Sequence, residues 1–218
     1  MEYINTFLNL SAFTEAKPNL PKPSLSLIEN TNQVYYIKKP LIFEVTDTDF
    51  SLDQKLSEYN KRHITFKLKR SFVADDTWYT ICLPFNVAQK QLVEVFGGEK
   101  VELRTFDHID GTVMYFKSVE NLEAGVPYLI KPNSNTDTLI FEDVIINMNN
   151  NPSRQVGADG YFMQGTYQAT VLNTDGTNLF LSDDNTFFRP SESEHRMKGF
   201  RVYFIVPKDV QVPRPEIT

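Results

Sequence analysis

The stretch HITFKLK, His63–Lys69, alternates apolar and polar side chains in the way of a β-strand with one dry and one wet face. Ile64, Phe66 and Leu68 fall on one side, because successive side chains of a strand point to opposite faces. The other side carries Thr65, Lys67 and Lys69. A strand of this kind covers a core with one face and meets water with the other, as antiparallel sheets commonly do.

Further runs of strand length lie on both sides of this stretch. They are PSLSLIE and QVYYIKKPLIFEVTDT before it, and TVMYFK, PYLIK, LIFEDVII, YFMQGTY, NLFLS and FRVYFIV after it. Asp110-Gly111 and Asp175-Gly176 supply the positive-φ residues of tight hairpins, and Asp159-Gly160, Asp184-Asn185 and Gly125 mark further bends. Strands separated by turns about every ten residues predict an all-β fold, a predominantly antiparallel β-sandwich in which a jelly-roll-like topology is possible.

One or two short helices accompany the predicted strands. The stretch NVAQKQLVEVFGG has Asn86 as a helix N-cap, with Gln89 three residues later to complete a capping box. Gly97 ends this helix in a left-handed conformation. Its apolar stripe is Ala88, Leu92, Val95 and Phe96, which we interpret as core. The earlier stretch DFSLDQKLSEYNKR fits either a short helix or a loop.

The stretch WYTICLPF, Trp78–Phe85, contains the single tryptophan and the single cysteine of the chain. A period of two places Cys82 between Thr80 and Pro84 on one face, without a histidine or cation nearby in the sequence to stabilise a thiolate. We therefore interpret Cys82 as structural. The predicted core comprises Ile64, Phe66, Leu68, Tyr79, Ile81, Leu83, Phe85, Phe200, Val202 and Phe204.

Composition restricts the class of protein and of partner. The chain has 218 residues, of which 41% are hydrophobic and 13% aromatic, so it has ample material for a core. Its net charge of -6 disfavours a nucleic-acid partner, because no concentrated basic stripe offsets it. One cysteine excludes an internal disulfide and a cysteine-based metal site. No stretch of about 18 apolar residues predicts a transmembrane segment.

Titratable residues give no pattern typical of a metal or cofactor site, so we expect no metal and no cofactor. His63, His108 and His195 lack metal-ligand spacing. Three groups of acidic residues are better explained as turns than as calcium ligands. They are Asp47, Asp49 and Asp53; Asp107 and Asp110; and Asp183 and Asp184 with Asn185. A pair of catalytic carboxylates, as in glycosidases, remains an alternative, because the sequence does not show which carboxyls converge.

Aromatic residues supply the candidate binding site. Large aromatic side chains cover sheets, but an exposed set can also stack against sugar rings. The candidate ligand-binding residues are Trp78, Tyr115, Tyr161 and Tyr203, with Tyr35 and Tyr36 as further members of such a platform.

The order of several motifs resembles a known family. ITFKLKRSFVADDTWYTICLPFNV, VFGG, LEAGVPYLIKP, DGYFMQGTY, DGTNLFLSDDNTFFRPS and MKGFRVYFIVP follow one another in the chain. This succession resembles a β-rich module of secreted and cell-surface proteins of Bacteroidetes, over about Arg62 to Lys208. The resemblance implies an exported, often multi-domain protein, and it implies no established enzyme activity and no catalytic residues.

These observations together predict three segments. Residues 1–60 form an N-terminal extension that supplies strands to the sheet, or the end of a preceding β domain. Residues 61–209 form the β-sandwich, and residues 210–218 begin a linker or tail, because prolines space them. We expect a non-enzymatic extracellular or cell-surface module that binds a glycan or a host or cell-surface protein, or that spaces other domains. The alternative is a carbohydrate-active enzyme domain with paired Asp or Glu residues.

Overall fold

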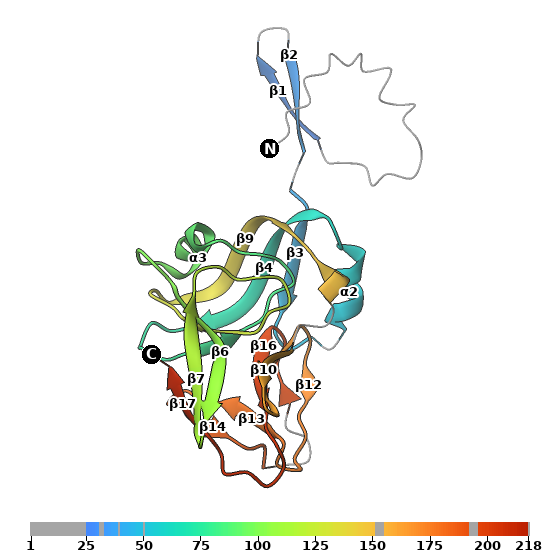
Figure 1. Cartoon of the computed structure of the whole chain (residues 1–218). Coiled ribbons are helices and arrows are strands. Elements are labelled where there is room, and N and C mark those ends of the chain that lie inside the picture. The colour runs from blue at the N-terminus through green and yellow to red at the C-terminus, as the bar shows by residue number, and fades with distance from the viewer. Residues whose placement is uncertain are drawn as a thin grey trace. The chain divides into compact units, whose positions relative to one another are not determined.

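A computed structural model describes residues 25–30, 33–38, 40–49, 51–150, 155–191 and 196–217 (Figure 1). The chain has two compact units, Met1–Leu41 and Ile42–Thr218. In the first unit, β1 (Leu25–Asn30) and β2 (Gln33–Lys38) pair as an antiparallel hairpin. The second unit contains the remaining described elements and the core.

The stretch that predicts the fold lies at the centre of a three-stranded sheet. β4 (His63–Phe72) pairs in parallel with β3 (Ile42–Thr46) and antiparallel with β9 (Thr136–Ile145). Ile64, Phe66 and Leu68 are at most 2% exposed, so the predicted inward face of β4 is confirmed. Arg70 continues the same inward series between Leu68 and Phe72 and is only 4% exposed.

A second sheet has five strands in the order β17-β7-β6-β8-β5. β6 (Glu102–Asp110) pairs antiparallel with β7 (Val113–Val119) and with β8 (Tyr128–Lys131), which in turn pairs with β5 (Tyr79–Ile81). β17 (Arg214–Ile217) adds to β7 in parallel. The pairs β3–β4 and β17–β7 are parallel, whereas most strand pairs are antiparallel.

A third sheet also has five strands, in the order β10-β11-β16-β13-β14. They are β10 (Gln155–Ala158), β11 (Tyr161–Thr166), β16 (Arg201–Ile205), β13 (Asn178–Leu181) and β14 (Phe187–Phe188). A small ladder of β12 (Thr170–Val171) with β15 (Arg196–Met197) lies between β11 and β16 in the sequence. Figure 1 shows this sheet below the β3–β4–β9 sheet. With 47% strand and 10% helix, the all-β fold is confirmed.

In the described part of the chain, two short helices and one turn of 3₁₀ helix accompany the sheets. α2 (Leu52–Glu58) settles the open choice between helix and loop, and its Leu52 and Leu56 are buried. α3 (Gln89–Phe96) has the predicted position, and Gly97 ends it at φ 78°. The 3₁₀ turn is η1 (Met148–Asn150). No helix in the described part of the chain is long and apolar enough to cross a membrane.

The predicted cap of α3 is wrong. Ala88 occupies the N-cap position, and Asn86 instead accepts a hydrogen bond from the backbone N–H of Ala124 at 2.7 Å. Gln89 does not reach back to the helix start, because its side-chain amide binds the backbone of Val101 and Glu120. Ala88 is also exposed rather than part of the buried stripe. Tertiary hydrogen bonds to neighbouring segments have thus replaced the local capping box.

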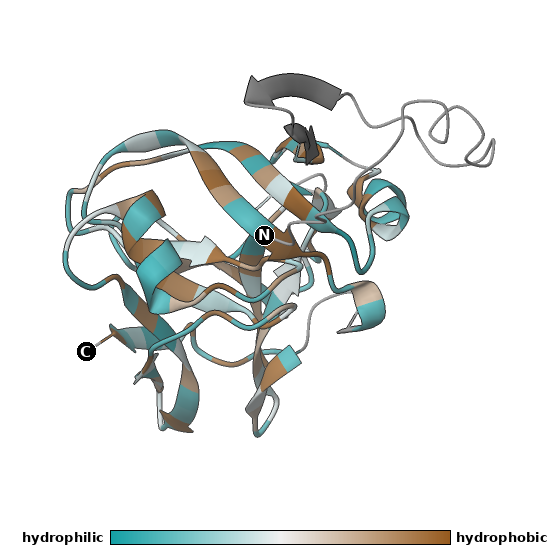
Figure 2. Cartoon of the chain, turned by 90° about the horizontal axis from the view of Figure 1, so that it is seen from above, coloured by the Kyte–Doolittle hydropathy of each residue, from teal (hydrophilic) through white to brown (hydrophobic). Residues whose placement is uncertain are grey.

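One continuous core joins the three sheets and both helices. Phe66 lies within it and packs against the rings of Phe43, Phe85 and Phe200, with centroid distances of 5.7, 4.9 and 5.4 Å. Of the ten predicted core residues, nine are buried, and Tyr79 is half-buried with its hydroxyl accepting a hydrogen bond from the N–H of Val73. Figure 2 shows apolar and polar residues alternating along the strands around this core.

The predicted turns have the expected backbone. Asp110↔Val113 closes the β6–β7 hairpin around Gly111, which has φ 56°. Ala158↔Tyr161 closes the β10–β11 hairpin around Asp159 and Gly160, both at positive φ. Because such φ values cost little for Gly and least among other residues for Asp and Asn, local sequence is sufficient to specify these hairpins.

The second compact unit begins at Ile42, earlier than the predicted residue 61, and it includes β3 and α2. β3 pairs with β4, so this part of the predicted N-terminal extension supplies a strand to the sheet, which is one of the two predicted alternatives. The predicted tail includes β17, in which Pro215 lies opposite Met114. Proline lacks an N–H for a ladder and is tolerated on edge strands such as this one, so its presence did not indicate a linker.

Candidate anion-binding hollow

A hollow of about 210 Å³ opens where two strands of the third sheet separate. β13 pairs with β16 at Asn178↔Ile205 and Leu179↔Phe204, and this ladder ends before Phe180, although β14 still pairs with Phe180 and Leu181 on the other edge of β13. The departing residues Phe180 and Leu181 form one wall of the hollow. The interruption of the β13–β16 ladder therefore creates the space.

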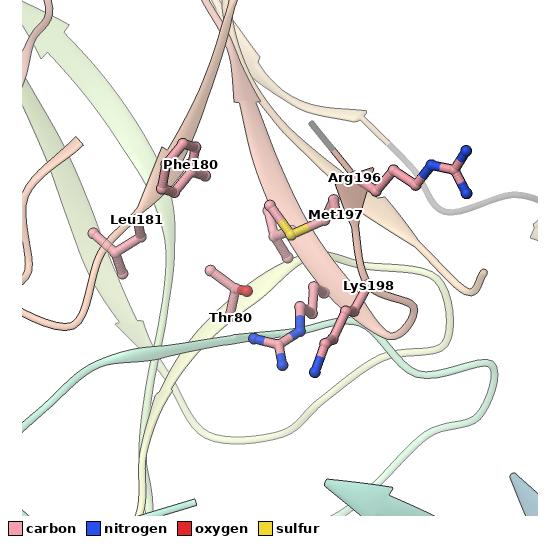
Figure 3. A pocket seen from close by; sticks show the side chains of 8 residues that line it. Thr80, Phe180, Leu181, Arg196, Met197 and Lys198 are labelled. Atoms are coloured by element: carbon pink, nitrogen blue, oxygen red, sulfur yellow. The ribbon is translucent and has the colours of Figure 1, made fainter. Parts of the chain in front are cut away.

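The walls of the hollow combine apolar side chains with cations. Phe180, Leu181, Met197 and Val202 are the apolar residues, Thr80 is the neutral polar one, and Arg196, Lys198 and Arg201 are the cations. No carboxylate is among these eight lining residues. Figure 3 shows Phe180, Leu181, Thr80 and Met197 around the open space, and the guanidinium of Arg196 extending away from it. Such a lining favours a ligand that has an apolar face and a negative charge.

Behind the hollow, the carboxylate of Asp47 pairs with two of its cations. The Asp47 side chain is 9% exposed and lies 2.9 Å from Arg201 Nη2 and 3.8 Å from Lys198 Nζ. The backbone carbonyl of Asp47 accepts a hydrogen bond from the N–H of Gly199. Asp47 thus attaches the end of β3 to the beginning of β16 and positions Arg201.

Arg70 adds a further cation behind the hollow. Its Nη1 donates to the carbonyl of Phe200 at 3.0 Å, and its guanidinium lies 4.4 Å from the centroid of the Phe72 ring. Burial lowers the pKa of Arg70 well below its ordinary value, and the charge of Arg201 lowers it further, whereas Asp47 and Tyr79 act in the opposite direction. Arg70, Arg201 and Asp47 form what we call the arginine cluster.

The backbone beside the arginine cluster is strained. Phe200 is fully buried and has φ 55°, a conformation uncommon for a bulky residue. Its carbonyl accepts hydrogen bonds from Arg70 Nη1 and from the N–H of Cys82. A Cβ on Gly199 would lie 2.6 Å from the carbonyl oxygen of Tyr167. Strain of this kind persists where surrounding contacts over-determine the backbone, and it is frequent at functional sites.

A second hollow of about 430 Å³ lies near the start of α3 and the end of β9. Its lining includes Asn86, Gln91 and Asn147, whose side chains each make a hydrogen bond to backbone. Asp143 is its one lining carboxylate and lies 2.9 Å from His63 Nδ1. Because the amides already serve the local fold, the first hollow is the better candidate site.

The structure does not bring the four predicted aromatic residues onto one surface. Trp78 is 8% exposed and lies under the guanidinium of Arg104 at 5.2 Å. Tyr115 is half-buried and stacks on His108 at 4.6 Å, on β7, which β6 and β8 separate from β5 in the sheet. Sequence spacing showed the strand faces but could not show which strands become neighbours.

Tyr161 and Tyr203 lie on neighbouring strands but on opposite faces of the third sheet. Met163 lies opposite Phe204, and both are buried, so Tyr161 shares the core-facing side of β11 with Met163. Tyr203 alternates with Phe204 and lies on the other side of the sheet. Partial burial raises the pKa of Tyr203.

Other titratable residues take the structural roles that their sequence suggested. Asp175 and Asp184 accept hydrogen bonds from the backbone N–H groups of Thr177 and Thr186, so both stabilise turns. Across the described residues, no three His, Cys, Asp or Glu side chains gather in a group that could hold a metal ion. His195 lies outside the described residues.

Cys82 is fully buried, and this burial raises the pKa of its thiol far above the ordinary range. We expect a thiol reagent such as Ellman's reagent to modify native Cys82 roughly 10³-fold more slowly than the denatured chain, because modification requires the core to open. Absorbance kinetics with and without guanidinium measure the ratio. Equal rates in both conditions would contradict a structural role for Cys82.

The residues of the arginine cluster were not predicted as site residues. The predicted wet face of β4 holds for Lys67 and Lys69, whereas Arg70, one residue beyond the quoted stretch, is buried. The signal was the strand period itself, which places Arg70 in register with Phe66 and Leu68.

Comparison of the chain with protein-family models, with curated proteins and with solved structures gave no match.

Proposed function

We propose that this chain is a non-enzymatic binding module whose hollow holds an acidic sugar residue of a glycan. The observation that carries the proposal is the lining itself, which combines the Phe180 ring with Lys198 and Arg201 and, among the residues that the structure describes, includes no carboxylate. A sugar ring presents C–H groups to an aromatic face, and its carboxylate or sulfate pairs with cations. The apolar wall of the hollow would contact the C–H face of the sugar ring, and its cations would pair with the carboxylate or sulfate.

The size of the hollow supports a single sugar ring rather than a large ligand. Its volume of about 210 Å³ is smaller than the roughly 300–1,000 Å³ of pockets that hold drug-sized ligands. Phe188 extends the apolar wall, because it stacks on Phe180 at 6.0 Å and is 46% exposed. Further sugar residues of the glycan would lie along this exposed ring.

The resemblance to the Bacteroidetes module supports an extracellular or cell-surface setting for this binding. In that setting the acidic glycan would belong to a cell surface or matrix. A protein partner is the competing choice, and the binding experiment below separates the two. In a spacer without any ligand, Lys198 and Arg201 would serve only as partners of Asp47.

The enzymatic alternative has less geometric support. Glycoside hydrolysis needs two carboxyls that face each other across the bond, about 5 to 9.5 Å apart. Asp143 is the one carboxylate that lines either of the two hollows described above. A binding role uses the cations that are present, so we favour it.

Binding to immobilised oligosaccharides tests the proposal. We expect glycans that end in uronic acid, sialic acid or a sulfated sugar to bind, and their uncharged counterparts to bind at least tenfold more weakly. Phe180→Ala and Lys198→Met should each weaken binding about tenfold, a change of about 1.4 kcal/mol. Increasing salt should also weaken binding, because part of the affinity is electrostatic.

Tyr115→Ala is the matched control, because it removes a half-buried aromatic side chain on a different sheet. We expect this variant to bind like the wild type. If neutral and acidic glycans bind equally, or if only Tyr115→Ala loses binding, the hollow is not the glycan site. If no glycan binds and a surface protein does, the proposed ligand class is wrong.

A further inference from the structure

The second hollow has room for a ligand larger than one sugar ring. Its volume is about 430 Å³, against about 210 Å³ for the first hollow, and pockets of roughly 300–1,000 Å³ commonly hold small molecules. Its lining combines two charged side chains, three amides and an apolar side chain, namely Lys61, Asp143, Asn86, Gln91, Asn147 and Ile145. The chemistry of this lining differs from that of the first hollow, because it includes both a cation and a carboxylate.

Two unusual backbone positions shape this hollow. β9 has a bulge here, since Glu142 and Asp143 together lie opposite the single residue Thr65 of β4. Asp143 has φ 51° and Lys61 has φ 62°, and such left-handed conformations are frequent at functional sites. The backbone N–H of Lys61 donates to the carbonyl of Ile146 at 2.8 Å, which holds Lys61 beside the end of β9. The bulge and this hydrogen bond bring both charged residues to one hollow.

Three amide side chains of the hollow each use one polar atom for the fold. Asn86 Oδ1 and Asn147 Oδ1 accept hydrogen bonds from backbone N–H groups at 2.7 and 3.1 Å. Gln91 Nε2 donates to the carbonyl of Glu142 at 2.7 Å. The opposite ends of these amides, two NH₂ groups and one carbonyl oxygen, have no partner among the residues that the structure describes. The hollow therefore offers two donors and one acceptor on side chains that the fold already orients.

The two charged residues of the hollow do not pair with each other. Asp143 Oδ1 lies 2.9 Å from His63 Nδ1, and within the described part of the chain neither Asp143 Oδ2 nor the Lys61 ammonium has a partner. Both side chains are exposed, so water solvates them in the free protein and they remain accessible. A ligand that carries one positive and one negative charge would match both.

We propose that the second hollow binds a zwitterionic ligand of the amino-acid class, a free α-amino acid or a dipeptide. The carboxylate of the ligand pairs with Lys61 and accepts hydrogen bonds from the NH₂ groups of Asn86 and Asn147. The ammonium of the ligand pairs with Asp143 and donates to the carbonyl oxygen of Gln91. This site is separate from the glycan site proposed for the first hollow, and neither proposal needs the other.

A long peptide that adds a strand to β9 fits this hollow less well. β9 is an edge strand, but Gln91 binds the carbonyl of Glu142 and so occupies part of the edge that a new strand would need. The ligand is therefore held by side chains and is small. Ile145 is 46% exposed and offers an apolar surface to the side chain of the ligand.

Ligand-observed NMR titrations of the wild-type chain with the common amino acids and a set of dipeptides test the proposal. We expect at least one of these zwitterions to bind, and the stronger of the two groups identifies the source of the ligand. N-acetylated and C-amidated derivatives of that ligand each lack one charge and should bind at least tenfold more weakly. The absence of binding at millimolar concentration, or equal binding of the blocked derivatives, would overturn the proposal.

Asp143→Asn and Asn147→Asp each change the free end of a side chain and keep the oxygen that anchors it. Asparagine also tolerates the positive φ at position 143. Each substitution should weaken binding of the zwitterion about tenfold. The loss caused by N-acetylation of the ligand should disappear in Asp143→Asn, because the ammonium has lost its partner. If Asp143→Asn still discriminates against the N-acetylated ligand, the assignment of Asp143 is wrong.

Asp137→Asn and Asn121→Asp make the same chemical changes outside the hollow and are the matched controls. Asp137 lies on β9 and accepts a hydrogen bond from Ser71, and Asn121 accepts one from the N–H of Gln89. Both controls should bind the zwitterion like the wild type. Losses as large as those of the hollow variants would reflect net charge alone and would contradict the site. If a hollow variant does not fold, the blocked derivatives still decide on the wild type, and glycan binding enters none of these measurements.

Discussion

Replacing Phe66 by alanine is expected to lower the free energy of unfolding by about 3–5 kcal/mol, the largest loss among the substitutions considered. Phe66 is fully buried, and three other aromatic rings surround it, from β3, from the segment after β5 and from the start of β16. Truncation leaves a cavity that rings held by three separate elements cannot fill. Urea denaturation followed by tryptophan fluorescence measures the loss.

Phe188→Ala is the control for this prediction, because Phe188 is 46% exposed at the edge of the third sheet. We expect this substitution to cost less than about 1 kcal/mol. Similar losses for Phe66→Ala and Phe188→Ala would contradict a single core centred on β4. Since typical domains are stable by only about 5–15 kcal/mol, Phe66→Ala should also reduce the yield of folded protein.

Asp47→Asn is expected to cost about 3 kcal/mol of stability, because it leaves Arg201 and Arg70 with no carboxylate between them. Asp47 is 6% exposed, so water cannot replace the lost charge at its own position. Arg201 is 27% exposed, so partial hydration keeps the loss at the lower end of the range for buried ion pairs. The measurement is again the urea midpoint and slope.

Glu44→Gln removes the same type of charge from an exposed pair and serves as the control. Glu44 lies 2.7 Å from Lys69 Nζ, with both side chains about half exposed. Exposed pairs contribute at most about 1 kcal/mol, so this variant should differ little from the wild type. A loss for Asp47→Asn no larger than that for Glu44→Gln would show that the arginine cluster does not depend on its carboxylate.

Asp47→Asn also connects stability to the proposed glycan site. The variant retains the apolar wall of the hollow but frees Lys198 and Arg201 from their shared partner. With more unpaired positive charge, the hollow should bind acidic glycans more strongly than it does in the wild type, and the oligosaccharide-binding experiment above measures the difference.

Local sequence predicted the strands and turns well because their signals act over a few residues. The alternation in β4 and the DG pairs around Gly111 and Gly160 appear in the structure as predicted. The predicted N-cap of α3 was wrong because hydrogen bonds to distant segments replaced the local ones. Asn86 and Gln89 had good local partners, but segments distant in sequence offered their side chains backbone hydrogen bonds as well.

The sequence alone could not show which distant residues meet in the candidate site. Phe180 and Lys198 are far apart in the chain, and an interrupted ladder between β13 and β16 brings them to one hollow. No pattern within either strand marks this interruption. The predicted aromatic platform failed to form one surface for the same reason, because the order of strands in a sheet is a tertiary property.

By itself, the sequence determined that this protein is an all-β sandwich with an aromatic core, since strand period and turn chemistry are local. The alternation of β4, continued to residue 70, places Arg70 on the side of Phe66 and Leu68, but it does not show that this position is buried. Only the tertiary structure decided that Arg70 would be buried and that Arg201 would pair with Asp47. The physical reason is that these charges lie on β4, on β16 and at the end of β3, which only folding brings together.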